Sequence, residues 1–397
     1  MDFELTEAQK MLQTTVRQFV SEHIIPLERD VLKKQSSLGS QNKFQMLGGE
    51  ENYRRLEEMG KDQGLWALYV PTKYGGAGLG NMEFVLVTTE LGRTIVTFDF
   101  GGDVFDIFDI VDDEVKEKYL MPTVREGRHW AFAQTEMSAG VDPAGIESTA
   151  IKQGNSWVMN GSKTFVSDAD IADYALIMAV TDKGKRAYGI SMFIVDRETP
   201  TTPGYKLVRA TECMGGVMSP YEICLDNCVI PENNLVGEEN KGFRIAQKFL
   251  EIRGRLHHSS WNVGIASRCI ELAAEYAKQR TTFGKPLAER QSIQWMLADS
   301  AIEAHAVKLA GYYLAWKADQ GENIRHEAAM TKILGDEMIG RVTDRAIQIF
   351  GGVGTTNELP VERFYRHVRI LRVGGGSMEV MRMFIARNIL NGSASFL

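Results

Sequence analysis

The stretch Gln134-Thr135-Glu136-Met137-Ser138-Ala139-Gly140-Val141-Asp142 marks the point where the character of this chain changes. Before it, apolar residues recur at helical spacing. After it, glycine, serine, threonine and β-branched residues increase, and short apolar runs alternate with turns. The stretch itself is typical of a strand end that runs into a loop of small residues. Backbone N–H groups and hydroxyls at such an edge suit a flavin ring or a phosphate, although a plain turn between strands has the same pattern.

The segment before this stretch, residues 1–128, is predicted to be helical. Thr6-Glu7-Ala8-Gln9 fits a capping box, in which the threonine hydroxyl and the glutamine amide satisfy free N–H groups. Pro26 is expected to end or bend the helix that follows. Further helices are predicted over 50–63, 82–94 and 113–126.

The middle segment, residues 129–242, is predicted to be a small antiparallel β-domain or barrel. Residues 175–180 and 192–195 have the composition of buried strands. Asn160-Gly161 is a strong hairpin-turn dipeptide and is expected to connect two strands. Residues 222–226 alternate between polar and apolar, as a half-buried strand does.

From residue 243 to 397 the helical periodicity returns. Long helices are predicted near 243–280, 289–319, 326–350 and 377–390. Four such helices with this much apolar surface indicate a four-helix bundle and favour oligomerisation.

Composition and charge exclude several classes of protein. The net charge of −7 over 397 residues argues against a nucleic-acid partner, which needs clustered basic surface. Cys224 and Cys228 lie four residues apart, but no second pair or histidine cluster follows, so we expect no metal. Few cysteines, no signal peptide and no apolar run long enough to span a membrane together favour a cytoplasmic location.

Four segments in one order now give a specific pattern. Residues 134–142 are similar to the T-E-P-x-A-G-S-D motif of acyl-CoA dehydrogenases, and Gly161-Ser162-Lys163-Thr164-Phe165-Val166-Ser167-Asp168 resembles the strand and turn that stack against their flavin. Residues 280–291 resemble R-x-x-F-G-x-x-L…Q, and residues 348–354 resemble Q-x-x-G-G-x-G. Because the resemblance runs nearly end to end, it is far more specific than any single match.

This resemblance implies an α+β fold with an N-terminal helical domain (1–128), a middle antiparallel β-barrel-like domain (129–242) and a C-terminal four-helix bundle (243–397). It also implies an oxidoreductase of fatty acid metabolism that uses FAD, acts on an acyl-CoA or related thioester, passes electrons to an electron-transfer flavoprotein and forms a homotetramer built as a dimer of dimers.

The resemblance assigns roles to individual residues. Those expected to bond the flavin ring edge are Gln134, Thr135 and Ser167, with Phe165 stacked on the ring. Those expected to hold FAD across a subunit boundary are Arg280, Phe283, Gln291, Gln348 and Gly352. Arg255 matches a family arginine beside the substrate. Val141 stands where a serine commonly touches the thioester, which puts that contact in doubt, and Met137 replaces a proline.

The catalytic glutamate of the family is absent from both of its usual places. In most members it lies two residues before the threonine or serine of an E-G-[TS] motif, where this chain has Gly375 in Val373-Gly374-Gly375-Gly376-Ser377. In other members it lies on the first helix of the C-terminal block, where this chain has Gly254. Removing the proton α to a thioester still requires a base beside the α-carbon.

Several residues could replace that glutamate. The stretch Phe98–Asp106 falls where relatives line the acyl pocket, and Asp99 and Asp103 are its first candidates because an apolar wall would raise a carboxyl pKa. Glu251 lies one turn before Gly254 on nearly the same helix face. Glu379 is expected to be a helix N-terminal charge. His257 and His258 follow Arg255, and a histidine at flavin distance could act as an acid or a base, although helix-surface packing is the more common role for such residues.

Two other functions remain compatible with the sequence. The same fold could support other flavin chemistry, as a reductase, lyase or monooxygenase. It could also form a catalytically inactive subunit beside an active homologue. Glycine at both base positions enlarges the pocket near the reacting carbons, which hints at a bulky, branched or cyclic acyl group.

Overall fold

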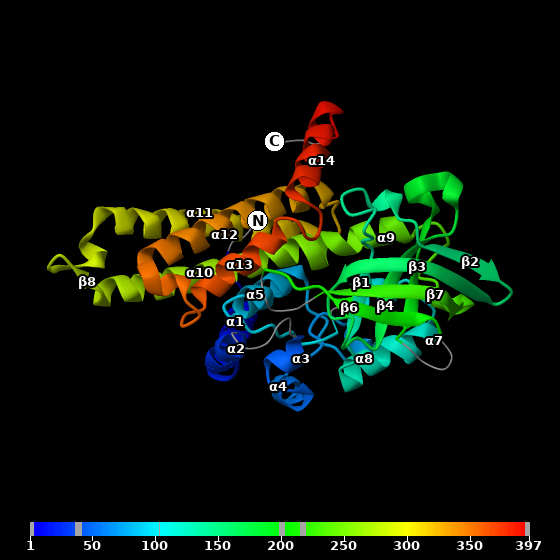
Figure 1. The fold of residues 1–397 in the computed structure, drawn as a ribbon, viewed down its shortest axis with the longest axis horizontal. Helices are drawn as coiled ribbons and strands as arrows, with labels where there is room; N and C mark the ends of the chain where they lie inside the picture. The colour runs from blue at the N-terminus through cyan, green and yellow to red at the C-terminus, as the bar shows by residue number, and fades with distance from the viewer. Residues whose placement is uncertain (1–3, 36–41, 103, 198–202, 215–219, 394–397) are drawn as a thin grey trace. The chain divides into compact units, whose positions relative to one another are not determined.

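The computed structural model describes residues 4–35, 42–102, 104–197, 203–214 and 220–393 (Figure 1). The chain forms two compact units that are discontinuous in sequence. A helical unit contains Met1–Leu38, Gly80–Asp99 and Leu250–Leu397, and a sheet unit contains Gly39–Leu79 and Phe100–Phe249. The three domains predicted from the sequence, with their boundaries, stay a prediction.

The helical unit is built from two groups of elements. Its N-terminal elements are α1 (Glu7–Phe19), the π-helix η1 (Val20–Ile24), the 3-10 helix η2 (Ile25–Leu27), α2 (Glu28–Gln35) and α5 (Asn81–Leu91). Its C-terminal elements are η8 (Leu250–Leu256), α10 (His257–Gln279), β8 (Thr281–Thr282), β9 (Lys285–Pro286), η9 (Leu287–Glu289), α11 (Gln291–Asp319), α12 (Arg325–Phe350), η10 (Gly351–Thr355), α13 (Val361–Leu371) and α14 (Met378–Leu390).

The start of α1 is the capping box that the sequence predicts. The Thr6 hydroxyl accepts from the Gln9 N–H at 3.2 Å, and the Gln9 side chain accepts from the Thr6 N–H at 3.0 Å. The predicted break at Pro26 is also present, because the chain changes there to the short helix η2 before α2 begins. Local side-chain chemistry therefore sets both ends of the first helical segment.

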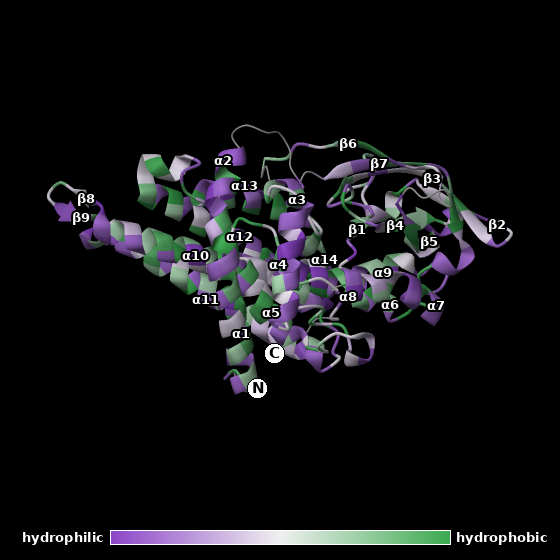
Figure 2. Cartoon of the chain, turned by 90° about the horizontal axis from the view of Figure 1, so that it is seen from below, coloured by the Kyte–Doolittle hydropathy of each residue, from purple (hydrophilic) through white to green (hydrophobic). Residues whose placement is uncertain are grey.

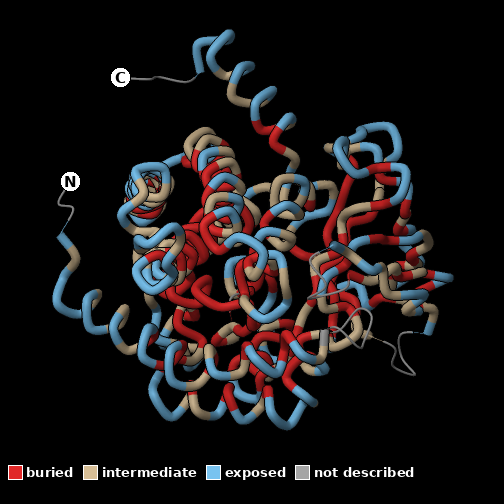
Figure 3. Tube along the Cα trace, turned by 60° about the vertical axis from the view of Figure 1, so that its left-hand side comes forward, coloured by how far each residue is buried: buried red, intermediate tan, exposed pale blue. Residues whose placement is uncertain are grey.

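The three long helices α10, α11 and α12 lie side by side and pack against one another in pairs, with the β8–β9 hairpin at the tip of the α10–α11 turn (Figure 1). The helix that completes their packing is α5, which contacts α10 and α11. The sequence predicts a bundle of C-terminal helices alone, and it misses α13, which packs on α12. The C-terminal helix α14 is buried only at Met378 and Met381, near its start (Figure 3).

Two glycines let α5 and α10 come close. A Cβ at Gly264 would lie 2.0 Å from the Thr89 carbonyl oxygen, and one at Gly92 would lie 2.3 Å from that of Trp261. The helix α5 is hydrophobic on nearly all sides (Figure 2), and its residues from Phe84 to Thr88 are buried. A helix that is apolar all round must be covered by neighbours, which explains why α5 lies inside the bundle.

The sheet unit combines short helices with one sheet. Its helical elements are α3 (Lys43–Met46), α4 (Glu50–Asp62), η3 (Thr72–Tyr74), α6 (Phe105–Phe108), α7 (Asp113–Val115), η4 (Lys116–Leu120), α8 (Met121–Glu126), η5 (Pro143–Gly145), η6 (Lys183–Gly189), η7 (Glu232–Asn234) and α9 (Gly242–Phe249). Its strands are β1 (Trp130–Ala133), β2 (Thr149–Gln153), β3 (Ser156–Val166), β4 (Tyr174–Val180), β5 (Ile190–Asp196), β6 (Tyr205–Ala210) and β7 (Tyr221–Pro231).

The sheet is mixed rather than purely antiparallel, which corrects the sequence-based expectation. Its strand order is β1-β4-β2-β3-β7-β6, and β5 pairs with β4. The β1–β4 pair is parallel, and a single parallel bridge joins Thr149 of β2 to Val180 of β4. The predicted buried strands are confirmed as β4 and β5, whose central residues lie in a core with Trp157 and Tyr205.

The predicted hairpin turn at Asn160-Gly161 is wrong. These residues lie inside β3, and the chain reverses instead between Gln153 of β2 and Ser156 of β3. The pairing of β3 with β7 is irregular at Gly161, whose φ is +146°. A Cβ there would lie 2.2 Å from the Ser148 hydroxyl oxygen, so this glycine serves a close approach within the sheet rather than a turn.

Candidate functional site

The loop after β1 is fixed to β3 by a buried ion pair. The Lys163 Nζ lies 2.6 Å from Glu136 Oε1 and donates to the Gln134 carbonyl at 3.3 Å. The Glu136 carboxylate also accepts from the backbone N–H of Glu147 at 2.6 Å and of Ser148 at 3.1 Å. One side chain therefore fixes the loop at both its start and its end.

Electrostatics within this pair follow from its burial. Loss of hydration lowers the pKa of Lys163 to about 8, although the adjacent carboxylate opposes the shift. Burial also opposes ionisation of Glu136, but Lys163 and the hydrogen bonds outweigh it and hold the pKa of Glu136 below its ordinary value. The carboxylate is therefore held as the charged partner that keeps Lys163 in place.

The polar edge beside this pair is where the sequence predicts flavin contacts. Gln134 Oε1 is buried and has no hydrogen-bond partner within the described protein. The backbone of Thr135 accepts from the Thr164 N–H at 2.9 Å, which joins the loop to β3. Phe165 has 54% of its surface exposed and a φ of +55°, and Ser167 is exposed two residues later. An aromatic residue in the left-handed region is strained unless its surroundings require it.

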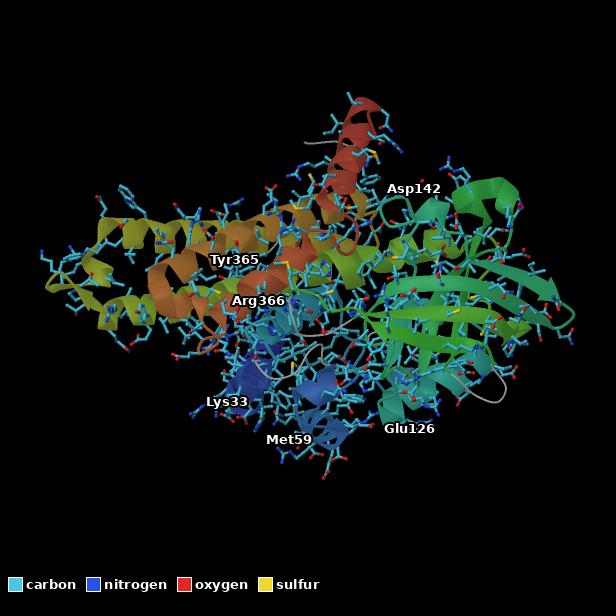
Figure 4. The ribbon with its side chains drawn as sticks, viewed as in Figure 1. Lys33, Met59, Glu126, Asp142, Tyr365 and Arg366 are labelled. Atoms are coloured by element: carbon cyan, nitrogen blue, oxygen red, sulfur yellow. The ribbon has the colours of Figure 1, made fainter. Side chains whose placement is uncertain are left out.

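These features fit a flavin. A buried amide oxygen without a partner calls for a donor from a bound group, because leaving it unpaired costs about 1–3 kcal/mol. An exposed aromatic face beside it suits stacking on a planar ring. Val141 follows in the same loop and is 68% exposed, next to Asp142, which Figure 4 labels. Val141 thus offers an apolar side chain where the resemblance implies a hydroxyl.

In the helical unit, the residues predicted to hold FAD across a subunit boundary lie at two exposed positions. Arg280 and Phe283 flank β8, and Phe283 is 98% exposed with a φ of +49°. Arg290 stabilises this hairpin by donating to the Thr282 carbonyl at 2.6 Å. Gln291 begins α11, while Gln348 and Gly352 are exposed where α12 ends.

Within the described residues, no carboxylate lies within 4.0 Å of the Arg280 guanidinium. Arg280 and Phe283 are both exposed on this hairpin, so packing within the protein does not account for their side chains. Their arrangement suits a ligand that carries phosphate and an aromatic ring, since a guanidinium binds phosphate through paired hydrogen bonds.

The second predicted region lies elsewhere in the helical unit, around Gly375 and Gly254. Gly375 lies between α13 and α14 with a φ of +65°. A Cβ built on it would lie 3.1 Å from His258 Cε1, 3.6 Å from His258 Nδ1 and 3.6 Å from Lys332 Cε. Gly254 lies in the π-helix η8, and a Cβ there would lie 3.2 Å from Leu250 Cδ2. Segments of π-helix occur often at functional sites.

A fully buried polar cluster stands beside Gly375. Lys332 Nζ pairs with Asp336 Oδ2 and donates to the Leu371 carbonyl at 2.9 Å. Asn262 donates to the other oxygen of Asp336 at 3.0 Å. Burial lowers the pKa of Lys332 and raises that of Asp336, while each partner opposes the other's shift. The Lys332 contact anchors the end of α13, and with it the glycine loop, to α12.

The other predicted site residues have distinct surroundings. Arg255 is 4% exposed, and burial lowers its pKa although Glu251 opposes the shift. Glu251 Oε1 lies 4.0 Å from Arg325 Nε. Asp99 is partly buried and acts electrostatically on His257, opposing the burial that lowers the pKa of that histidine to about 4. Asp103 lies outside the described residues.

Sequence reasoning named His258 but favoured helix-surface packing for it, and it missed the Lys332–Asp336 pair as part of this region. His258 is partly buried against Gly375 rather than a plain helix-surface residue. Lysine and aspartate four residues apart are also typical of an exposed helix face, so spacing alone gave no signal. Lys163 stood within a quoted segment, but only the fold brings its amine to Glu136.

Two further searches of the described residues bear on function. They contain no group of three or more histidine, cysteine, aspartate or glutamate residues arranged to hold a metal ion. None of their helices is both long enough and apolar enough to cross a membrane.

Known families match nearly the whole length of the chain. Residues 6–127 match the acyl-CoA dehydrogenase N-terminal domain, residues 131–228 the middle domain and residues 240–390 the C-terminal domain. The chain belongs to the acyl-CoA dehydrogenase family. The predicted family and α+β fold class are therefore confirmed, and the family's cofactor is FAD.

Individual relatives extend this finding. The chain is 34% identical over 409 residues to (R)-benzylsuccinyl-CoA dehydrogenase of Thauera aromatica, covering 100% of this chain and 98% of the relative. It is 33% identical to 3-(aryl)acrylate reductase of Clostridium sporogenes, covering 97% and 99%. The solved butyryl-CoA dehydrogenase of Megasphaera elsdenii superposes with a TM-score of 0.88 at 31% identity, covering 98% of this chain and 100% of that one.

Proposed function

We propose that this acyl-CoA dehydrogenase family member removes hydrogen from the α and β carbons of an acyl-CoA or carrier-bound thioester, with a base that stands at neither usual position. The observation that carries the proposal is the buried, unpartnered Gln134 Oε1 beside the exposed ring of Phe165. The FAD supplies the hydride acceptor when it is bound, and these residues orient it. A relative named for benzylsuccinyl-CoA supports a thioester substrate.

Different residues of the chain would bind the flavin edge, the rest of FAD and the thioester. Gln134, Thr135, Phe165 and Ser167 would hold the flavin edge, as the fixed loop after β1 allows. The residues that would hold the rest of FAD from a neighbouring subunit are Arg280, Phe283, Gln291, Gln348 and Gly352. Arg255, Val141 and Gly375 would line the thioester.

The carboxylates named from the sequence remain candidates for the proton acceptor: Asp99, Asp103 and Glu251. Glu251 stands near Arg255 and Arg325, and nearby positive charges stabilise a carboxylate and weaken it as a base. Asp99 stands between Phe98 and Phe100 in the sequence, and the side chains of both phenylalanines are buried. Asp99→Asn is therefore the sharper of the two tests within the described residues.

An anaerobic titration of the purified protein with a panel of acyl-CoAs tests the function. Loss of flavin absorbance with one of them, and formation of the enoyl product, would support dehydrogenation. A panel that includes aryl, branched and cyclic acyl groups probes the enlarged pocket that glycine at 254 and 375 implies. A yellow protein that no thioester bleaches would contradict the proposal.

A reductase is the second candidate function, because the arylacrylate reductase relative covers nearly the whole chain. Reduction uses the same carbons in the opposite direction, so the same groups would return the proton. Consumption of a reductant with an enoyl thioester, but no bleaching by any saturated one, would favour it. Lyase or monooxygenase activity would require different products, and a colourless protein would indicate an inactive subunit.

The assembly and electron acceptor complete the proposal. The exposed apolar residues Trp295, Ile302, Leu309 and Tyr313 recur on one face of α11 at intervals of seven, seven and four. Such a stripe supports an oligomer, which we propose to be a homotetramer built as a dimer of dimers. A relative named as a subunit of a caffeyl-CoA reductase-Etf complex supports an electron-transfer flavoprotein as acceptor. A cytoplasmic location and a role in fatty acid metabolism stay part of the proposal. Sedimentation of the FAD-loaded protein tests the assembly, and a monomer that binds FAD stoichiometrically would contradict it.

A further inference from the structure

The imidazole of His258 faces the position where the family's glutamate side chain is missing. The Cβ of any side chain at Gly375 would point at the Cε1–Nδ1 edge of this ring, at 3.1 and 3.6 Å. A carboxylate at 375 and a histidine at 258 would therefore compete for the same space. This chain has glycine at 375, which leaves the space of the missing side chain open, and the His258 ring borders that space.

The edge that faces this space carries a nitrogen with nothing bound to it. His258 Nδ1 is buried and has no hydrogen-bond partner anywhere in the described protein. The nearby amine of Lys332 is already engaged, since it is bound to Asp336 and to the Leu371 carbonyl. A buried ring nitrogen without a hydrogen bond destabilises the fold. Such unpaired groups are often found where a bound ligand supplies the missing hydrogen bond.

We propose that His258 is the proton-transfer group that replaces the family's glutamate, with Nδ1 as the atom that takes the α-proton of the thioester. This inference rests on the proposed dehydrogenation. The thioester α-C–H bond breaks, its proton forms an N–H bond at His258 Nδ1, and imidazole becomes imidazolium. The electron pair left on the α-carbon would form the α,β double bond as the β-hydrogen left with its own pair, for which FAD would supply the hydride acceptor when it is bound. The imidazolium then releases its proton to solvent.

The charges around His258 keep the ring neutral, which is the form that can accept a proton, although the same positive charge weakens the ring as a base, as it does at Glu251. Burial lowers the pKa of His258 well below its ordinary value, and the positive charge of Lys332 on α12 adds to the shift. His257 on the same helix and His367 on α13 act in the same direction. The ring is therefore neutral at neutral pH. Acidification from about pH 7.5 to about pH 6, which would protonate an ordinary histidine, should not slow proton removal by this group.

Substitution of His258 by glutamine tests the proposal in the FAD-loaded protein. Glutamine keeps a polar side chain but cannot accept the proton, so the rate of bleaching should fall by about 10²–10⁴-fold while FAD content stays normal. A second measurement isolates the proton step: with the flavin chemically reduced, the α-proton of a saturated acyl-CoA should exchange with D₂O in wild type and not in His258→Gln. The matched control is His305→Gln, an exposed histidine on α11, which should exchange at the wild-type rate.

A rescue variant separates a proton acceptor from a merely structural residue. His258→Val combined with Gly375→Glu removes the ring and returns a carboxylate to the vacated space, so it should regain both exchange and bleaching. A left-handed glutamate costs about 1–2 kcal/mol, which makes the variant less stable but still foldable. A residue that only supported the fold would not be replaced by a carboxylate from another loop.

The outcomes distinguish this inference from the proposed function. If wild type bleaches and His258→Gln bleaches and exchanges at the native rate, His258 is not the acceptor, and Asp99 and Glu251 become the groups to test. If no thioester bleaches wild type, dehydrogenation fails; α-proton exchange that is lost in His258→Gln would still support the role of this histidine. If wild type neither bleaches nor exchanges with any thioester, both proposals are wrong.

Discussion

The loop after β1 and the loop between α13 and α14 are built in opposite ways. The first is fixed by the buried Lys163–Glu136 pair, and it resembles the family motif except that Met137 and Val141 stand in place of a proline and a serine. The second is a run of three glycines where the family carries its catalytic acid, with left-handed backbone at Gly375 and Gly376. The comparison teaches that the residues proposed for flavin binding and the family's usual position for the base lie on separate loops, so that one set can change while the other is kept.

The largest expected effect is the loss of stability when the ion pair that fixes the first loop is broken. Lys163→Met should lower the free energy of unfolding by about 3–5 kcal/mol, because it leaves the Glu136 carboxylate buried without its cation. Urea denaturation measures the loss. The matched control is Lys152→Met, whose partner Glu232 is about as exposed as the lysine, so that the change should be within about 1 kcal/mol. Equal effects in the two variants would mean that burial does not set the strength of this pair.

Cofactor retention comes next. Arg280→Ala should weaken FAD binding by about one to two decades, since a charge-assisted hydrogen bond to phosphate contributes about 1.5–3 kcal/mol. Flavin content after dialysis, and titration of the apoprotein with FAD, measure the change. Lys278→Ala removes a nearby exposed cation from α10 and serves as the control. Unchanged flavin content in Arg280→Ala would remove this hairpin from the FAD site.

The glycine loop offers a smaller effect on stability. Gly375→Ala should destabilise the protein by about 1–2 kcal/mol, because it places a Cβ at a φ of +65° and 3.1 Å from the His258 ring. Gly311→Ala on α11 is the contrasting variant, since an added Cβ there has no atom within 4 Å. It should stabilise the helix by about 0.5–1 kcal/mol. Thermal denaturation of both variants gives the comparison, and a neutral Gly375→Ala would show that this loop tolerates side chains.

The smallest expected effect is a pH dependence of stability that belongs to the first loop. The pKa of Glu136 is lower in the folded protein than in the unfolded chain, so its contribution is fully present above about pH 4.5 and declines as the pH falls toward the folded pKa. Urea denaturation between about pH 5 and pH 3 should therefore show stability falling on acidification. Glu136→Gln should flatten this slope, and a slope that is unchanged in the variant would assign the acid sensitivity to other carboxylates.

Local sequence determined much of this protein. Thr6 and Gln9 predict the start of α1, and Pro26 predicts its break, because caps and proline act within a few residues. Continuous apolar runs predict β4 and β5. The ordered motifs at 134–142, 161–168, 280–291 and 348–354 predict the family, and with it FAD, because each keeps a fixed set of residue types at fixed spacing.

Tertiary structure decided what depends on distant parts of the chain. Asn160-Gly161 has the composition of a turn, yet it lies within β3, which pairs with β7 on both sides of it. The glycine leaves room for the Ser148 side chain, which packs where a Cβ would stand. The fourth helix beside α10, α11 and α12 is α5, since two glycines allow its backbone to approach. His258 follows Arg255 on an ordinary helical pattern, and only the fold brings Gly375 beside its ring. Sequence spacing fixes what neighbouring residues can do, whereas the meeting of residues far apart in the chain depends on how the whole core packs.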